Sequence, residues 1–272
     1  MRRLLTFFII TVFASLTCEA HELVEVFCRS SVPGPQERRM LVCLPDGYHT
    51  CDERYPVLYL LHGARGNEAS WIFKSNILHD IDSLTSAGAM KKTIVVFPNM
   101  NQYDDDLDYG TSRIKGAWES FFEVDGTVES AFVKDVVNAT DSLFRTIPDK
   151  SHRAIAGLSI GGMQTIFISA SYPDTFGYVG AFSPMVNSFI RKSTYSDFYK
   201  GIKAKLKEQF RDPPVLYWIM VGRMDFFEPH MDAFHHYLNE KGYPHKYYVS
   251  RGGHQWNNWK KYSIMFMENL WK

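Results

Sequence analysis

The chain has few cysteines, and their number argues against a disulfide framework. Four cysteines occur in 272 residues, and three of them, Cys28, Cys43 and Cys51, follow the N-terminal segment that we expect to be removed. An odd number in an oxidising compartment implies no fixed set of bridges, although one pair among the three is left open. Cys28 and Cys43 lie in apolar, strand-like segments, where we expect small buried side chains.

The chain also lacks net charge. It has 30 basic and 30 acidic side chains, so no overall field attracts it to nucleic acid or to an anionic membrane. We therefore expect no nucleic-acid partner, and a substrate that is neutral or recognised locally. A hydrophobic content of 45% with 15% aromatic residues excludes a disordered chain.

An apolar run near the N-terminus, residues 4–16, is shorter than the roughly 20 residues that a membrane-spanning helix needs. Arg2 and Arg3 precede it, and small residues end it at Ala20, a pattern typical of a secretory signal peptide. We expect residues 1–20 to be removed after Ala20 and the remaining chain, 21–272, to be secreted or periplasmic. Anchoring through a lipid on Cys18 is a weaker alternative, because residues 15–17 match a lipobox poorly.

The order of apolar segments predicts a single α/β domain over residues 21–272. Residues 22–30 and 38–45 are separated by a proline- and glycine-containing turn, which indicates an antiparallel hairpin. Further strands are expected at 56–61, 93–97, 152–158, 178–182, 215–221 and 246–249, with helical segments between most of them. Such alternation predicts a mostly parallel central sheet with helices on both faces.

The most informative motif is Gly157 to Gly161, which places Ser159 between two glycines directly after an apolar strand and before a helical segment. Strand, sharp turn and helix in this order are typical of a nucleophile elbow, which exposes a serine hydroxyl at the end of a strand. A serine hydroxyl is a weak nucleophile, so it needs a general base within hydrogen-bond reach and a carboxylate that orients this base.

Position along the chain selects the partners of Ser159. Asp225 follows the predicted strand at 215–221, and His254 lies in a glycine-rich turn after the last predicted strand. This gives the order serine, acid, histidine that the α/β-hydrolase fold uses. Glu228 and Asp232 are rival acids, but both fall inside the helical segment that follows Asp225.

An acyl transfer also needs N–H donors for the oxyanion of the tetrahedral intermediate. We expect one donor at the backbone of Ile160, directly after the nucleophile. The second should come from the loop after the strand at 56–61, where Ala64 is our choice, with Gly63 and Arg65 as alternatives. Aromatic or apolar residues near the predicted crevice that could contact an acyl group or a sugar ring are Trp118, Met185, Phe226 and Trp256.

Three blocks of sequence, residues 59–63 with Glu68 and Trp71, residues 153–162, and residues 252–259, resemble the esterase D-like branch of the α/β hydrolases. Within that branch the chain is similar to the secreted carbohydrate esterases of family 1, which include feruloyl and acetylxylan esterases. The resemblance implies Ser159, Asp225 and His254 as the triad, no metal or organic cofactor, and ester-substituted plant cell-wall polysaccharide such as xylan as substrate. The family often has more glycines after the His-Gly pair than this chain has.

Other functions remain open at this point. They are a short-chain acyl thioesterase similar to S-formylglutathione hydrolase, an acyltransferase, a serine peptidase, and a non-catalytic carbohydrate-binding protein on a hydrolase fold. The aspartates at 104, 105, 106 and 108 suggest a calcium loop, but the glycine is displaced and no closing glutamate follows, so we expect a solvated acidic loop.

Overall fold

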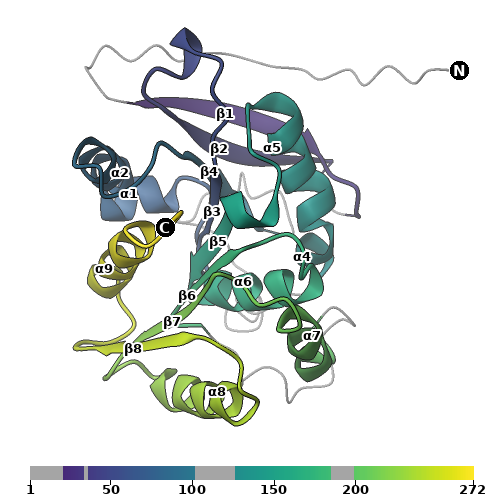
Figure 1. Ribbon diagram of the computed structural model, residues 1–272, viewed down its shortest axis with the longest axis vertical. Helices are drawn as coiled ribbons and strands as arrows, with labels where there is room; N and C mark the ends of the chain where they lie inside the picture. The colour runs from purple at the N-terminus through teal and green to yellow at the C-terminus, as the bar shows by residue number, and fades with distance from the viewer. Residues whose placement is uncertain (1–20, 34–35, 102–125, 185–198) are drawn as a thin grey trace, which may run out of the picture.

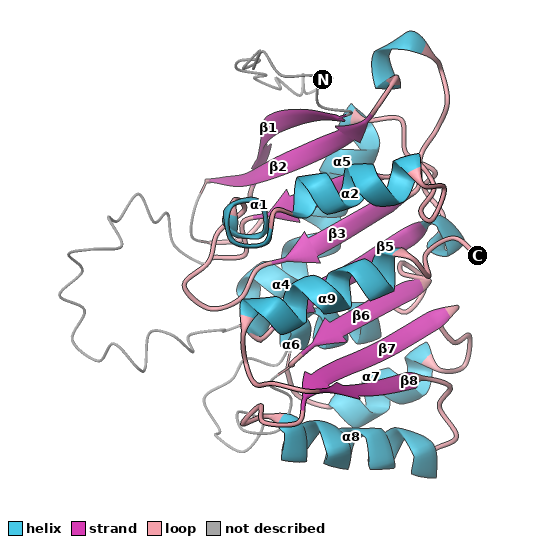
Figure 2. Cartoon of the chain, turned by 90° about the vertical axis from the view of Figure 1, so that its left-hand side faces the viewer, coloured by secondary structure: helices cyan, strands magenta, loops and turns pink. Residues whose placement is uncertain are grey.

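A computed structural model describes residues 21–33, 36–101, 126–184 and 199–272. Its strands form a single sheet of eight, in the order β1-β2-β4-β3-β5-β6-β7-β8 (Figure 2). In chain order the strands are β1 (His21–Arg29), β2 (Glu37–Pro45), β3 (Val57–Leu61), β4 (Ile94–Pro98), β5 (Arg153–Leu158), β6 (Tyr178–Phe182), β7 (Leu216–Gly222) and β8 (Lys246–Ser250). Strands β1 and β2 pair antiparallel with each other, β2 pairs antiparallel with β4, and all other pairs are parallel. The predicted hairpin and parallel sheet are confirmed, with strand ends within one residue of those expected.

Helices cover both faces of the sheet, which Figure 1 shows nearly edge-on. They are α1 (Ser70–Ser75), α2 (Ile77–Ser86), α4 (Thr127–Phe132), α5 (Asn138–Leu143), α6 (Ile160–Ser171), α7 (Ile202–Gln209), α8 (Glu228–Glu240) and α9 (Trp256–Met267). One π-helical turn (Val133–Val137) joins α4 to α5, and short 3-10 turns occupy Tyr48–Thr50 and Lys150–His152. Helices α1, α2 and α9 lie on one face, and α4 to α7 lie on the other (Figure 1).

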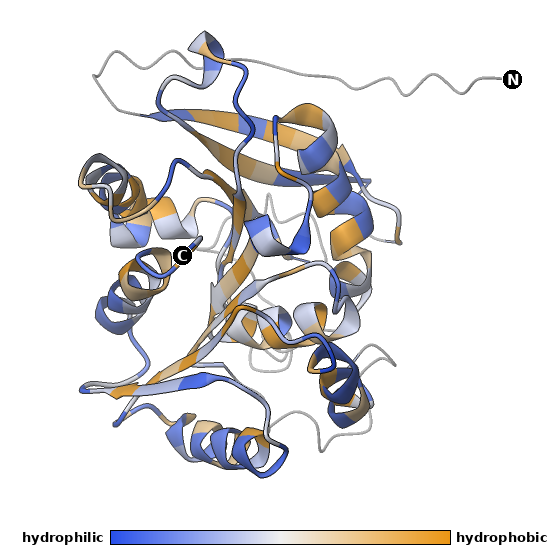
Figure 3. Cartoon of the chain, in the orientation of Figure 1, coloured by the Kyte–Doolittle hydropathy of each residue, from blue (hydrophilic) through white to orange (hydrophobic). Residues whose placement is uncertain are grey.

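The core is accordingly divided into two apolar clusters, one on each face of the sheet. One cluster contains residues of α6 and α8, and the other contains residues of α2 and α9. The central strands are buried along their whole length, which explains their continuous apolar sequences. In Figure 3 the hydrophobic colour accordingly concentrates on the strands and on the inward faces of the helices.

The cysteines fit this division. Cys28 belongs to the α6 cluster and Cys43 to the α9 cluster, so the sheet separates them. Cys51 is half-buried, and its thiol lies 3.1 Å from the Tyr55 hydroxyl. All three are free thiols, which answers the question of pairing among them.

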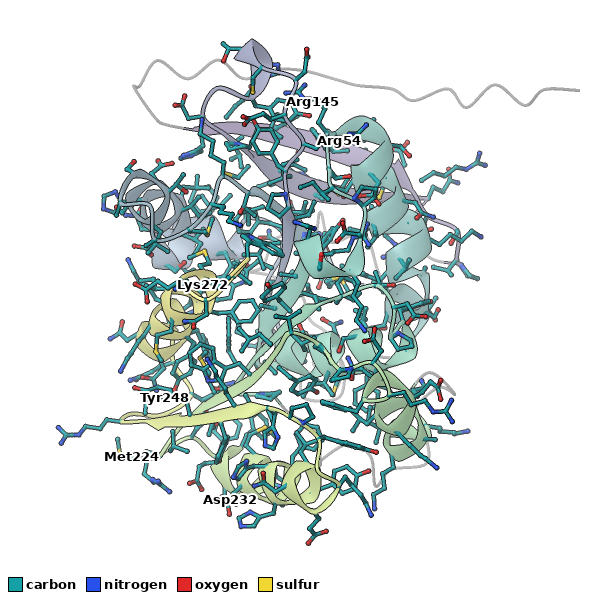
Figure 4. The ribbon with its side chains drawn as sticks, viewed as in Figure 1. Arg54, Arg145, Met224, Asp232, Tyr248 and Lys272 are labelled. Atoms are coloured by element: carbon teal, nitrogen blue, oxygen red, sulfur yellow. The ribbon has the colours of Figure 1, made fainter. Side chains whose placement is uncertain are left out.

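The end of the molecule that carries the amino ends of the parallel strands is fastened by polar contacts. Arg54 and Arg145, both labelled in Figure 4, link the segments that precede β3 and β5. The Arg54 guanidinium donates to the Thr146 carbonyl at 3.0 Å, and Arg145 Nε donates to the Glu53 carbonyl at 3.1 Å. The opposite edge, where the parallel strands end, is left for the loops that bring the predicted site residues together.

Candidate active site

Ser159 lies between β5 and α6 in a strained turn. Its φ of 55° and ψ of −116° fall in a region that residues other than glycine rarely adopt, as a nucleophile elbow requires. Its N–H donates to the Phe182 carbonyl at 2.8 Å, which fixes the turn against the end of β6. The predicted strand, turn and helix are therefore present in that order.

The glycine at 161 is required because the turn passes very close to the loop after β3. A Cβ on Gly161 would lie 2.2 Å from the His62 carbonyl oxygen, and a Cβ on Gly157 would lie 2.5 Å from the Gly161 carbonyl oxygen. Both distances are well inside van der Waals contact. The two glycines thus allow β5, α6 and the loop after β3 to meet beside the serine.

His254 joins the serine to a buried carboxylate. Its Nε2 lies 3.0 Å from the Ser159 hydroxyl oxygen, and its Nδ1 lies 3.0 Å and 3.2 Å from the two carboxylate oxygens of Asp225. Asp225 follows β7, and His254 lies in the loop between β8 and α9. The structure thus brings together the three side chains that the sequence singled out, from three separate loops at the carboxyl edge of the sheet.

The Asp225 carboxylate is completely buried, and hydrogen bonds stabilise its charge. Burial raises its pKa, but donors from His254, from the Phe227 N–H at 3.0 Å and from Ser183 outweigh burial, and the net pKa lies below the ordinary value. An ionised Asp225 accepts the Nδ1 proton of His254. The other ring nitrogen, Nε2, is then free to accept the proton of the Ser159 hydroxyl.

The rival acids lie elsewhere. Glu228 accepts from Arg223 at 2.7 Å, and Asp232 lies 3.5 Å from His236 on the outer side of α8. Both belong to α8, as the sequence indicated. Neither has a contact with His254 among those that the structure describes.

The loop after β3 is held by His62, which is buried. Its Nε2 accepts from the Met100 N–H at 3.0 Å, so its Nδ1 carries the proton and donates to the Gly63 carbonyl at 2.8 Å. Burial lowers the pKa of His62 to about 4, and the ring is therefore neutral near pH 7. His62 thus fastens the loop after β3 to the loop after β4.

The same loop brings Gly63, an alternative for the second oxyanion donor, close to Ser159. A Cβ on Gly63 would lie 3.3 Å from the Ser159 Cβ. The Gly63 carbonyl accepts from His62 and, at 3.0 Å, from the Gly66 N–H. Because the peptide is trans, the Ala64 N–H points to the opposite side from that carbonyl. Ile160 is the first residue of α6, where helix geometry leaves the N–H without an intrahelical acceptor.

Of the predicted contact residues, Phe226 lies beside His254. The Phe226 ring lies 4.6 Å from the imidazole between centroids, and the residue is 65% exposed to solvent. Trp256 is half-buried against Trp71, at 5.3 Å between ring centroids. Met224, labelled in Figure 4, is also exposed on the loop after β7. The other two predicted contacts, Trp118 and Met185, fall outside the described residues.

Sequence reasoning missed the packing behind the triad. Ser183, directly after β6, and Trp259, in α9, interact with Asp225 and His254 respectively, and neither was predicted to be a site residue. Ser183 was detectable as a polar residue at the carboxyl end of a central strand. Glu68 and Trp71, quoted for the resemblance, are both buried: Glu68 accepts from Asn99 at 2.8 Å, and Trp71 donates to the Leu61 carbonyl at 3.0 Å.

Among the described residues, no group of three His, Cys, Asp or Glu side chains could hold a metal ion. The aspartates at 104–108 are not among these residues. Over the same part of the chain, no helix has both the length and the apolar character needed to cross a membrane.

The sheet order, the elbow and the three loops define the α/β-hydrolase fold. The model of the Esterase family matches residues 31–264, and the chain therefore belongs to the Esterase family. It is similar to an endo-1,4-beta-xylanase/feruloyl esterase of Xylanibacter ruminicola, with 31% identity over 85% of this chain. That match spans 29% of the relative's length. An acetyl esterase of Caldicellulosiruptor saccharolyticus is 25% identical over 77% of this chain and 81% of its own.

Solved structures of low sequence identity share the fold. A family 1 ferulic acid esterase from the fungus Anaeromyces mucronatus superposes with a TM-score of 0.73 at 20% identity, covering 95% of this chain and 93% of its own. An S-formylglutathione hydrolase from Staphylococcus aureus gives 0.65 at 18% identity, covering 91% of this chain and all of its own. The likeness at this level establishes the α/β-hydrolase fold for the part of the chain that the structure describes.

Proposed function

We propose that this chain is a serine esterase that hydrolyses feruloyl or acetyl esters on plant cell-wall polysaccharides such as xylan. The observation that supports this most directly is the hydrogen-bonded series Ser159, His254 and Asp225, with its two distances of 3.0 Å. The names of the relatives from Xylanibacter ruminicola and Caldicellulosiruptor saccharolyticus support the ester class. The proposal includes export of the chain after removal of residues 1–20.

In the first half of the reaction, the Ser159 oxygen attacks the acyl carbonyl carbon while His254 Nε2 takes the hydroxyl proton. The carbonyl oxygen becomes an oxyanion, for which the Ile160 and Ala64 N–H groups are the proposed donors. Collapse of this intermediate breaks the bond to the sugar oxygen. His254 gives its proton to that oxygen, and the polysaccharide hydroxyl leaves.

In the second half, water attacks the acyl-enzyme, and His254 takes one of its protons. The bond to Ser159 breaks, His254 returns the proton to the serine oxygen, and the carboxylic acid is released. Asp225 stays ionised throughout and stabilises the imidazolium that forms twice in each cycle. No further reactant is needed beyond the ester and water.

The proposed acyl specificity rests on two aromatic side chains. Phe226, exposed beside His254, and the half-buried Trp256 offer apolar surface to an aromatic acyl group or to a sugar ring. We therefore expect methyl ferulate to be a better substrate than methyl acetate, which has the same leaving group. Trp118 and Met185 remain proposed contacts from the sequence.

The test is a substrate panel with the chain from residue 21. Methyl ferulate, acetylated xylan and S-formylglutathione are each incubated with the parent protein and with Ser159→Ala, and the released acid is measured. We expect release from one of the two oxygen esters by the parent protein and none by the variant. Preference for the thioester would favour the S-formylglutathione hydrolase alternative. No release from any of the three by a folded parent protein would refute the proposal.

A further inference from the structure

We propose that Ser183 and Trp259 are positioning residues, which hold the Asp225 carboxylate and the His254 ring in their reactive arrangement. Neither touches Ser159 in the described structure, and both act through the two members of the triad behind it. The inference rests on the proposed function, because its measurable effect is on ester hydrolysis.

The direction of the hydrogen bonds fixes the role of the Ser183 hydroxyl. Trp259 Nε1 lies 3.1 Å from the Ser183 hydroxyl oxygen, and an indole N–H is a donor only. The hydroxyl oxygen therefore accepts from Trp259, which leaves its own proton for another acceptor. We infer that this acceptor is the Asp225 carboxylate, whose pKa Ser183 helps to lower. Donation thus runs from the indole to the hydroxyl and from the hydroxyl to the carboxylate.

The surroundings make this donation important. Ser183 and the Asp225 carboxylate are both inaccessible to solvent, so water cannot replace a missing donor there. The carboxylate has two other donors, the Phe227 N–H and His254 Nδ1. With the inferred Ser183 donor, the carboxylate has three donors, which together hold it against the imidazole.

Trp259 restrains the imidazole as well as the hydroxyl. Its ring lies 4.8 Å from the His254 ring between centroids, at an interplanar angle of 86°. The edge of one ring thus meets the face of the other, a favourable aromatic contact. One buried side chain therefore touches the base directly and the acid through Ser183.

Ser183 also has a costly backbone conformation. Its φ is 49°, a left-handed value that it shares with Ser159 and only three other non-glycine residues of the described chain. Its N–H donates to the Met220 carbonyl on β7 at 2.7 Å, while the preceding Phe182 carbonyl accepts from the Ser159 N–H. The end of β6 therefore connects the elbow to the strand that leads to Asp225. A strained serine at this junction is expected where its side chain has a function.

The experiment compares the parent protein with Ser183→Ala and Trp259→Phe, using an activated aryl acetate whose hydrolysis Ser159→Ala abolishes. Losing a donor to a buried charge should lower kcat about 10- to 100-fold for Ser183→Ala, with KM unchanged. Trp259→Phe keeps the ring but loses the indole N–H, so we expect a smaller fall in kcat. The double variant should be no slower than Ser183→Ala alone, because the indole acts through the hydroxyl.

A matched control is available at the other end of the sheet. Trp271 Nε1 donates to the Thr93 hydroxyl at 3.0 Å, and both side chains are buried, but Thr93 precedes the amino end of β4. Trp271→Phe should lower the melting temperature about as much as Trp259→Phe and leave kcat unchanged. Ser183→Gly removes the hydroxyl but relieves the backbone strain, so this variant should fold well. Its kcat should still be lower than that of the parent protein.

The outcomes separate the two proposals. If the folded parent protein hydrolyses no ester, the proposed function fails. If the parent is active and folded Ser183→Ala or Ser183→Gly retains its kcat, the positioning role is refuted. Equal losses of kcat in Trp259→Phe and Trp271→Phe would also refute it, because both would then reflect packing alone.

Discussion

His62 and His254 lie in loops at the same edge of the sheet, yet their ring nitrogens have different kinds of partner. Both nitrogens of His62 are bonded to backbone groups, and its side chain is buried. Those of His254 are bonded to a carboxylate and to a hydroxyl, and its side chain is 15% exposed. A histidine between two backbone groups holds a loop, whereas one between an acid and an alcohol can transfer a proton.

The largest effect should come from removing His254, the proposed general base. His254→Ala leaves Ser159 without a base, and we expect kcat to fall by about ten-thousandfold or more. The melting temperature should also fall, because the buried Asp225 carboxylate loses one of its donors, but the chain should still fold. Ester hydrolysis and thermal unfolding measured on the same sample check this. An active His254→Ala protein would remove the distinction between the two histidines.

Changing the acid that orients His254 should have the next largest effect. In Asp225→Asn, the amide oxygen takes the place that accepts from Phe227, so the NH₂ group faces His254 Nδ1. The ring then carries its proton on Nε2 and cannot accept the Ser159 proton, so we expect a fall in kcat of about a thousandfold.

Asp232→Asn is the matched control for this substitution, since that half-exposed carboxylate on α8 (Figure 4) contacts only His236 among the described groups. It should retain the parent kcat. Similar losses of kcat in Asp225→Asn and Asp232→Asn would mean that the loss does not depend on the contact between the carboxylate and His254.

His62 should affect stability through its protonation. In the folded chain the pKa of His62 is lowered to about 4 from its ordinary value of 6.5. As the pH falls through 6.5, the unfolded chain binds a proton that the folded chain does not, so stability is lost between about pH 6.5 and pH 4. The loss from this one group should reach about 3 kcal/mol.

In His62→Gln, which does not titrate, this part of the pH dependence should disappear. Urea unfolding at pH 7.5, 6 and 4.5 measures it in both proteins. The kcat of the variant should fall by about tenfold at most, far less than in His254→Ala, because only the loop after β3 loses a hydrogen bond. A pH dependence that survives the substitution unchanged would place the responsible group elsewhere.

The strands and the residues of the predicted triad could be located from the sequence because local order determines them. Alternating apolar segments gave the strand ends to within one residue. Ser159 directly follows β5, and Asp225 and His254 lie in the loops that directly follow β7 and β8. In a parallel sheet such positions share one edge. Nothing in the local sequence of Ser183 or Trp259 indicates that they meet, because their hydrogen bond joins residues 76 positions apart.

The same limit applies to His62. The sequence marks the His-Gly pair as a turn, but the acceptor role of Nε2 depends on Met100, which belongs to a different loop. Cys28 and Cys43 show the converse case, where apolar sequence context was sufficient. Both were expected to be buried and are 3% and 1% exposed. Burial follows from local pattern, whereas a side chain's partners follow from the packing of distant segments.

The smallest effect should come from Phe226, the exposed ring beside His254. Among the described contacts, His62 has no aromatic neighbour of this kind. Phe226→Ala removes the ring of a residue that is 65% exposed, and it leaves the hydrogen bonds of His254 intact. The loss of one ring contact should raise KM for methyl ferulate about two- to tenfold, with kcat for an aryl acetate unchanged. Phe27→Ala, on the distant edge strand β1, is the control, and we expect it to leave both constants unchanged. If Phe226→Ala also left KM for methyl ferulate unchanged, the acyl group would have to bind away from this ring, and the exposure of His254 would serve only the entry of water.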